Sequence, residues 1–203
     1  MRASATRHAA KGTHYKAVVI GGSTGGSEAL DVILAALPKD FALPILAVQH
    51  LHPSDDGSFA CNLDRVTQLP VLEPHDKERI EQGRVYTAPA NYHMLVERDG
   101  TIGLSVDARV NYSRPSIDVL FESAALTWGE ALVAVILSGT NADGAKGMRA
   151  VKAAGGLTIA QDPASAKYPV MPQAAIEAEA VDEVLRAEEI GRLLAELGVR
   201  EKP

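Results

Sequence analysis

Short apolar runs alternate with amphipathic segments along most of the chain, and this rhythm limits the folds that the sequence can adopt. The pattern is typical of parallel strands that are buried on both faces, with a helix in each crossover. We expect strands at residues 16–20, 44–49, 84–87, 131–137, 157–160 and 181–185, and helices at 27–37, 57–67, 116–128, 144–154, 172–180 and 187–197.

One stretch in the middle of the chain, "HMLVERDGTIGLSV", departs from this rhythm. Its two extended runs flank Asp99-Gly100, a dipeptide that supplies the positive φ values of a tight turn, so we predict an antiparallel β-hairpin there. The predicted fold class is therefore α/β, with a doubly wound, mainly parallel, Rossmann-like sheet in three layers. A chain of 203 residues suits one such domain. We place it at 16–198, after a disordered tail at 1–15.

Composition excludes several classes of function. The net charge of −6 offers no basic field for nucleic acid. The longest strongly apolar run, 131–137, is far below the ~20 residues of a spanning helix, so a membrane-embedded protein is not expected. The tail lacks the apolar core of a secretory signal. The single cysteine, Cys61, has no partner for an internal disulfide, which fits a cytoplasmic protein, and we expect its thiol to be buried and inert.

Three loops that follow predicted strands carry reactive side chains. Ligands of doubly wound sheets bind beyond the carboxyl ends of the strands, so these loops are the first candidates for a site. They are "GGSTGG" at 21–26, "VQHLHP" with His50, and "LSGTNADG" with Asp143.

The glycine-rich loop at 21–26 has two interpretations. A dinucleotide-binding loop needs glycine at its third position, where Ser23 stands. A Walker loop needs lysine and then serine or threonine after its last glycine, where Ser27 and Glu28 stand. The spacing Gly21-x-Ser23-x-Gly25 between a strand and a helix instead matches a nucleophile elbow. A phosphate-binding loop and a turn whose serine caps the helix are the alternatives.

A nucleophilic serine needs a base within hydrogen-bond reach. His50 alone directly ends a strongly apolar strand, the one after the Ser23 unit, and His52 is the reserve candidate. Asp143 follows the most apolar strand and is the candidate that orients the imidazole, unless it only caps the next helix. The chain order Ser, His, Asp differs from that of α/β-hydrolases, and no HGGG motif is present, which disfavours a lipase-type enzyme.

Six ordered segments resemble the catalytic domain of the chemotaxis protein-glutamate methylesterase family, CheB, from about residue 16 to 197. They are "IGGSTGG", "VQHLHP", "YTAPANYHM", "SRPSIDVLFESAA", "VILSGTNADGAKGM" and "GGLTIAQDPASAKYPVMPQAAI". The resemblance implies a hydrolase that removes methyl groups from glutamates of chemoreceptor cytoplasmic domains, releasing methanol, and that in many members also deamidates glutamines. By position, its nucleophile falls on Ser23, its base on His50 and its acid on Asp143. This chemistry requires no metal or organic cofactor.

The chain departs from the family pattern in two places. The family typically has Met-Gly in the loop before the acid, where a backbone N–H serves the oxyanion hole; here Thr140 and Asn141 stand. We therefore expect the N–H groups of Thr24 and Thr140 to hold the oxyanion. The usual amino-terminal receiver domain has no counterpart in the sequence, so a catalytic fragment or a free-standing relative is expected.

Two further interpretations follow from the sequence. His93, Tyr168 and Met171 are candidates for the rim of the site, with core packing as the alternative. The competing functions are a nucleotide- or phosphate-binding module and a weakly active scaffold associated with a receptor. The sequence does not predict the oligomeric state.

Overall fold

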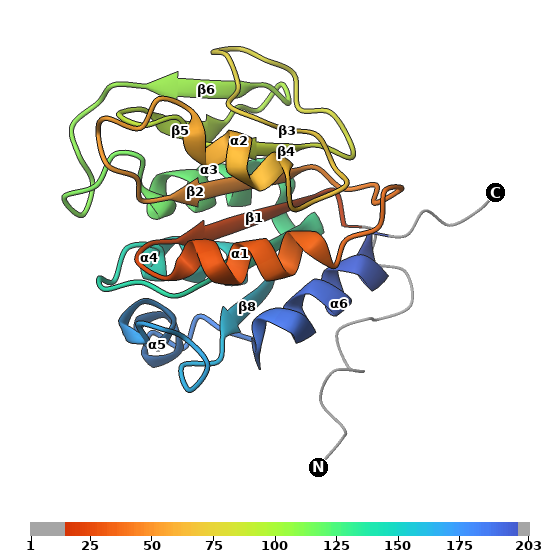
Figure 1. The fold of residues 1–203 in the computed structure, drawn as a ribbon. Helices are drawn as coiled ribbons and strands as arrows, with labels where there is room; N and C mark the ends of the chain where they lie inside the picture. The colour runs from red at the N-terminus through yellow and green to blue at the C-terminus, as the bar shows by residue number, and fades with distance from the viewer. Residues whose placement is uncertain (1–14, 199–203) are drawn as a thin grey trace.

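In the computed structural model, which describes residues 15–198, a parallel sheet of seven strands forms the centre of the molecule (Figure 1). The strand order is β3-β4-β2-β1-β7-β8-β9. The central strands pair in parallel because each is apolar on both faces and is joined to the next by a crossover. The strands are β1 (Ala17–Gly22), β2 (Ile45–Gln49), β3 (Val71–Leu72), β4 (Val85–Thr87), β7 (Leu132–Ile136), β8 (Leu157–Gln161) and β9 (Glu183–Leu185).

Helices cover both faces of the sheet. Side chains of α1 (Gly26–Ala35) and α6 (Ala187–Leu197) pack on one face, and those of α3 (Ile117–Trp128), α4 (Ala145–Ala153) and α5 (Val170–Glu177) pack on the other. Successive strand residues point to opposite faces of the sheet. Val18 therefore packs in the core on the side of α1 and α6, and Val19 packs in the core on the side of α3, α4 and α5. The predicted α/β fold is therefore confirmed. The short helix α2 (Ser58–Asp64) lies beside β3, and a 3₁₀ turn, η1 (Gly129–Ala131), precedes β7.

The predicted hairpin is present as β5 (His93–Val96) and β6 (Ile102–Ser105). Its turn differs in detail from the expectation, because only Gly100 has a positive φ, of 82°. The Glu97 N–H donates to the Thr101 carbonyl at 2.9 Å, which leaves three residues in the loop. Three-residue loops of this kind place a glycine in the left-handed region at their last position. The hairpin is fixed to α3 by a 3.0 Å hydrogen bond from Val96 N–H to Ser123 Oγ.

Several expectations from the sequence need correction or lie outside the structure. The two-residue strand β3 was not predicted. Cys61 is exposed, so the expected buried thiol is wrong. The predicted disordered tail falls almost entirely on residues 1–14, outside the described part of the chain. No helix within residues 15–198 is long and apolar enough to cross a membrane.

Candidate active site

The three loops that carry Ser23, His50 and Asp143 lie at the carboxyl ends of adjacent strands. They follow β1, β2 and β7, with β1 between the other two. The strand order reverses at β1, since the chain builds β2 and β4 on one side of it before crossing to β7 on the other. Crevices at such switch points are the usual ligand sites of open α/β sheets.

Ser23 stands on a sharp turn whose backbone is held from three sides. Its N–H donates to the Ser138 carbonyl at 2.9 Å, and its carbonyl accepts from the Gly26 N–H at 2.7 Å and the Gln49 side-chain amide at 2.7 Å. Gly25, at φ 76°, lets the chain turn directly into α1. Glycine tolerates that conformation without steric cost. The Ser23 hydroxyl makes no hydrogen bond with any described residue and is available to a ligand.

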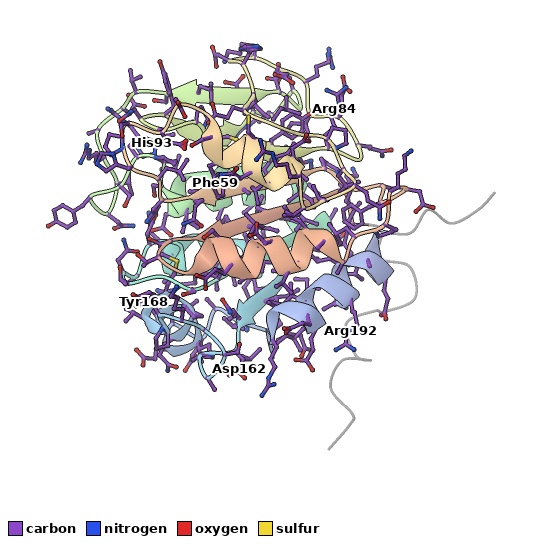
Figure 2. The ribbon with its side chains drawn as sticks, in the orientation of Figure 1. Phe59, Arg84, His93, Asp162, Tyr168 and Arg192 are labelled. Carbon is purple, nitrogen blue, oxygen red and sulfur yellow. The ribbon has the colours of Figure 1, made fainter. Side chains whose placement is uncertain are left out.

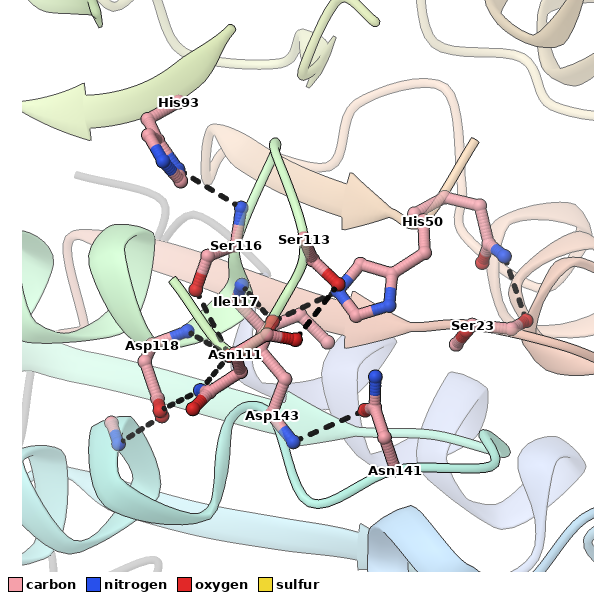
Figure 3. Close-up of polar contacts among 12 residues, drawn as sticks. Ser23, His50, His93, Asn111, Ser113, Ser116, Ile117, Asp118, Asn141 and Asp143 are labelled. Carbon is pink, nitrogen blue, oxygen red and sulfur yellow. Dashed lines mark hydrogen bonds and ion pairs between the residues drawn. The ribbon is translucent and has the colours of Figure 1, made fainter. Parts of the chain in front are cut away.

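His50 is hydrogen-bonded to Asp143, with 2.8 Å between Nε2 and Oδ2. In Figure 3, Asp143 and Ser23 lie on opposite sides of the imidazole ring. In the familiar serine protease triad the carboxylate binds Nδ1 and the serine faces Nε2. Here the carboxylate uses Nε2, so Nδ1 is the nitrogen left to serve Ser23.

Asp143 is buried and receives hydrogen bonds from several groups besides His50. Ile117 N–H donates to Oδ2 at 2.7 Å, and Ser116 Oγ and the Asn111 amide donate to Oδ1 at 2.9 and 2.8 Å (Figure 3). Burial raises the pKa of Asp143, but the hydrogen bonds from His50, Asn111 and Ile117 outweigh it and leave the pKa below its ordinary value. The side chain therefore stays ionised and fixed in place.

A second buried carboxylate, Asp118, lies next to Asp143. It accepts the Gly147 N–H at 2.7 Å and the Asn111 amide at 2.8 Å. Burial, with a smaller contribution from the charge of Asp143, raises the pKa of Asp118. The Asn111 amide nitrogen donates to both carboxylates and so separates two groups that would otherwise repel one another.

The other predicted site residues lie in different environments. His93 is 2% exposed; its Nδ1 accepts the Ser116 N–H at 3.2 Å, and its Nε2 lies 3.1 Å from the Ala108 carbonyl. Both ring nitrogens are within hydrogen-bond distance of backbone groups, so His93 holds the start of α3 in place. Met171 is fully buried against Gly139, whereas Tyr168 is 38% exposed on the side of the molecule toward which β1 and β2 point (Figure 2).

The two predicted oxyanion donors lie in loops that are tied together. Ser138 Oγ donates to the Thr24 carbonyl at 2.9 Å and accepts the Tyr168 N–H at 2.9 Å. The N–H groups of Thr24 and Thr140 donate to no described residue, so both are available. His52, the reserve base, is exposed and its Nδ1 lies 2.7 Å from Ser54 Oγ, with no contact to Asp143.

Sequence reasoning missed the residues that hold the site together. Ser138 and Gln161 fix the loop after β7, because the Ser138 N–H donates to Gln161 Oε1 at 2.8 Å. Gln49 ends β2 just as Gln161 ends β8, and a polar residue that ends a buried strand is a usable signal. Asn111 carries no such signal in the sequence. No group of three or more candidate metal ligands occurs within residues 15–198.

Comparison with known proteins identifies relatives over almost the whole chain. The model of the family described as "CheB methylesterase" matches residues 18–194. A relative from Leptospira interrogans is 46% identical over 184 residues, which cover 91% of this chain and 95% of the relative. Pseudomonas aeruginosa has a relative named protein-glutamate methylesterase/protein-glutamine glutaminase 2, 41% identical over 91% of this chain and 54% of its own length.

A solved structure shows the same fold. The crystal structure of the Thermotoga maritima CheB methylesterase catalytic domain matches with a TM-score of 0.86 and 39% identity, covering 90% of this chain and 98% of that one. The sequence resemblance, the sheet topology and these matches agree, and the chain belongs to the CheB methylesterase family.

Proposed function

We propose that this protein hydrolyses the γ-methyl esters of glutamate side chains in a methylated chemoreceptor, with Ser23 as nucleophile, His50 as base and Asp143 as the residue that orients the base. The observation that carries the proposal is the buried Asp143 carboxylate, fixed 2.8 Å from His50 beside the Ser23 turn. Such an arrangement is the requirement for activating a serine hydroxyl.

The proposed reaction has two stages. Ser23 Oγ attacks the ester carbonyl while its proton passes to His50 Nδ1, and Nε2–H donates to the ionised Asp143 throughout. The oxyanion accepts hydrogen bonds from the Thr24 and Thr140 N–H groups, and the C–O bond to methoxide breaks as His50 returns the proton to form methanol. Water, deprotonated by His50, then attacks the acyl-serine, which releases the glutamate carboxylate and restores the serine.

Four features support these roles. Asp143 cannot rotate without losing its bonds to Ile117, Ser116 and Asn111, so it keeps the His50 ring oriented. The lowered pKa of Asp143 keeps the negative charge that stabilises the imidazolium formed during attack. The N-terminus of α1 follows Ser23 and favours developing negative charge. The relatives carry the methylesterase name.

The same site supports deamidation of glutamine, an activity that the names of the relatives also carry. The acyl-serine would be identical, and ammonia would leave in place of methanol. The nucleotide- or phosphate-binding alternative remains testable by the thermal shift that nucleotides cause. A receptor-associated scaffold without turnover is tested by the methanol assay that follows.

The test measures methanol release from a purified, methylated chemoreceptor cytoplasmic fragment. We expect activity in the wild type, a loss on the order of 10⁴-fold in kcat for Asp143→Asn, and a comparable loss for His50→Ala. His52→Ala is the matched control and should retain near wild-type activity, because His52 is exposed and bonded only to Ser54. Full activity in His50→Ala, or loss of activity in His52→Ala, would contradict the assignment of His50 as the base.

A further inference from the structure

A pocket of about 130 Å³ is lined on one side by His50, and its other lining residues have no role in the reaction just described. Its walls include Arg109, Tyr112 and Arg114, and no aspartate or glutamate among the described residues lines it. The chain as a whole carries a net charge of −6, so a cationic pocket at the reacting edge is a local exception. Charge of this sign next to a catalytic base favours anionic groups of an incoming ligand.

The two arginines of the pocket have different tasks. Arg114 donates from Nη1 to the carbonyls of Val106 at 2.5 Å and Asp107 at 2.8 Å, so its guanidinium fixes the chain that leads out of the hairpin. Arg109 is exposed, and its side chain makes no hydrogen bond or ion pair with residues 15–198. A guanidinium has a planar set of donors that matches a carboxylate. Arg109 is therefore the cation of the pocket that is free to take one.

The turn that follows Arg109 is held rigidly and presents a tyrosine. Val110 and Ser113 exchange both backbone hydrogen bonds, at 3.1 and 2.9 Å, which leaves Asn111 and Tyr112 as the central residues of a two-residue turn. Both have positive φ, 49° and 63°. Asparagine is common at the first position, but the second is usually glycine.

Tyr112 is 96% exposed in this unfavourable conformation. Nothing in the fold uses the ring, whereas a glycine at the same place would relieve the backbone strain. Tyrosine is enriched at protein interfaces because it offers a large rigid surface with a polar tip. Asn111, bonded to Asp143 and Asp118, ties this turn directly to the catalytic acid.

We propose that residues 109–114 form the docking element for the protein substrate, in which Arg109 pairs with a carboxylate of the substrate close to the esterified glutamate and Tyr112 covers the adjoining substrate surface. Side chains one turn apart on a helix are about 5–6 Å from each other, so an acidic residue three or four positions from the ester suits a pocket lined by both His50 and Arg109. The inference rests on the proposed function. It adds that acidic residues of the substrate next to an esterified glutamate determine which ester is hydrolysed.

The test uses two methylated receptor fragments that differ only at the positions three and four residues from the esterified glutamate, with Glu in one and Gln in the other. For the Glu fragment we expect kcat/KM to fall about three- to fivefold in Arg109→Ala and about tenfold or more in Arg109→Glu, with kcat little changed and the wild-type value lowered by salt. The Gln fragment should show little response to either variant. Arg192→Glu, an equal charge change on α6, is the control and should act as wild type (Figure 2).

Tyr112→Gly separates docking from structure. We expect its melting temperature to equal or exceed that of the wild type, because strain is relieved, while KM for either fragment rises about fivefold or more. Leu126→Ala is the matched control, since Leu126 is also a large exposed side chain, 79% exposed on α3. Wild-type KM in Tyr112→Gly, or kcat/KM within twofold of wild type in Arg109→Glu on the Glu fragment, would overturn the docking element.

Binding of the fragments to Ser23→Ala protein, followed by fluorescence anisotropy, distinguishes the two levels of the proposal. A wild type that releases no methanol, with binding that still depends on Arg109, refutes the proposed function and supports the docking element. If substitution of Arg109 changes neither methanol release nor binding, the docking element is refuted and the proposed function stands.

Discussion

Gly21→Ala is a small change that connects strand packing to Asp143, the proposed catalytic acid. A Cβ at position 21 would lie 2.3 Å from Ile117 Cγ2. Carbon atoms in contact prefer about 3.5–4.0 Å, so one of the two groups must move by roughly 1.2 Å. Ile117 cannot retreat freely, because a Cβ built at Gly144 on another side would also lie 2.8 Å from the same methyl group.

The cost of this substitution has two parts. Overpacking of a tight core lowers the free energy of unfolding by about 1–3 kcal/mol. The Ile117 N–H, 2.7 Å from Asp143 Oδ2, must shift with its side chain. A hydrogen bond to a charged group contributes about 1.5–3 kcal/mol, so its loss in the transition state would lower kcat/KM by about ten- to a hundredfold.

A double-mutant cycle in urea unfolding and in methanol release measures both parts. Ile117→Ala alone should cost about 2–5 kcal/mol, and the double variant should cost at least about 1 kcal/mol less than the sum, because the new methyl group fills the space of the old one. Ile33→Ala is the control: Ile33 lies in the core cluster on the opposite face of the sheet, so its cost should add to that of Gly21→Ala within about 0.5 kcal/mol. A Gly21→Ala protein with wild-type stability and activity would refute the reasoning.

Three further predictions follow from the contacts of the site. Asn111→Ala and Asn111→Gly should both lower kcat/KM about tenfold and shift the pH profile, since both lose the amide that bonds Asp143 at 2.8 Å. Asn62→Ala is the control, and full activity in Asn111→Gly would show that only the backbone of the turn matters. The stability advantage of wild type over Asp143→Asn should be present above the ordinary pKa of about 3.8. It should disappear as the pH falls through the lower folded-state pKa, because the unfolded chain takes up the proton first; urea midpoints across pH 2–7 that stay parallel would contradict this. Ser138→Ala should cost about 1–3 kcal/mol of unfolding free energy, because it leaves the Tyr168 N–H and the Thr24 carbonyl without their partner, and a thermal melt with an unchanged midpoint would rule that out.

Most of the fold could be predicted because each element carries a local signal. Within residues 15–198, apolar runs and helical periodicity located the six longer strands of the sheet and the six α-helices, with ends that differ by a few residues. The strand β3 has two residues, too few to establish any period. The hairpin was expected from Asp99-Gly100, yet only the glycine adopts a positive φ, because the loop contains three residues and not two.

The candidate site was only partly predictable. The positions of its loops follow from the sheet topology, whereas the side-chain contacts between distant parts of the chain do not follow from any local pattern. Ser23, His50 and Asp143 each follow an apolar strand, so the parallel sheet brings their loops to one edge. Asn111 bonds Asp143, which is 32 positions away in the sequence. The turn that places Asn111 has a left-handed backbone but contains no glycine, so the sequence does not indicate it. The sequence also does not predict that Asp143 binds Nε2 of His50 and not Nδ1, because this depends on the orientation of the side chain alone.

The proposed mechanism depends most directly on Ser23 as the nucleophile. The decisive measurement is the rate of methanol release from methylated receptor fragment by Ser23→Ala relative to wild type, with circular dichroism and urea unfolding to verify an intact fold. We predict a loss of several orders of magnitude, about 10³- to 10⁶-fold, because the variant lacks the hydroxyl that attacks the ester. A folded Ser23→Ala protein that retains a tenth or more of the wild-type rate would contradict the mechanism.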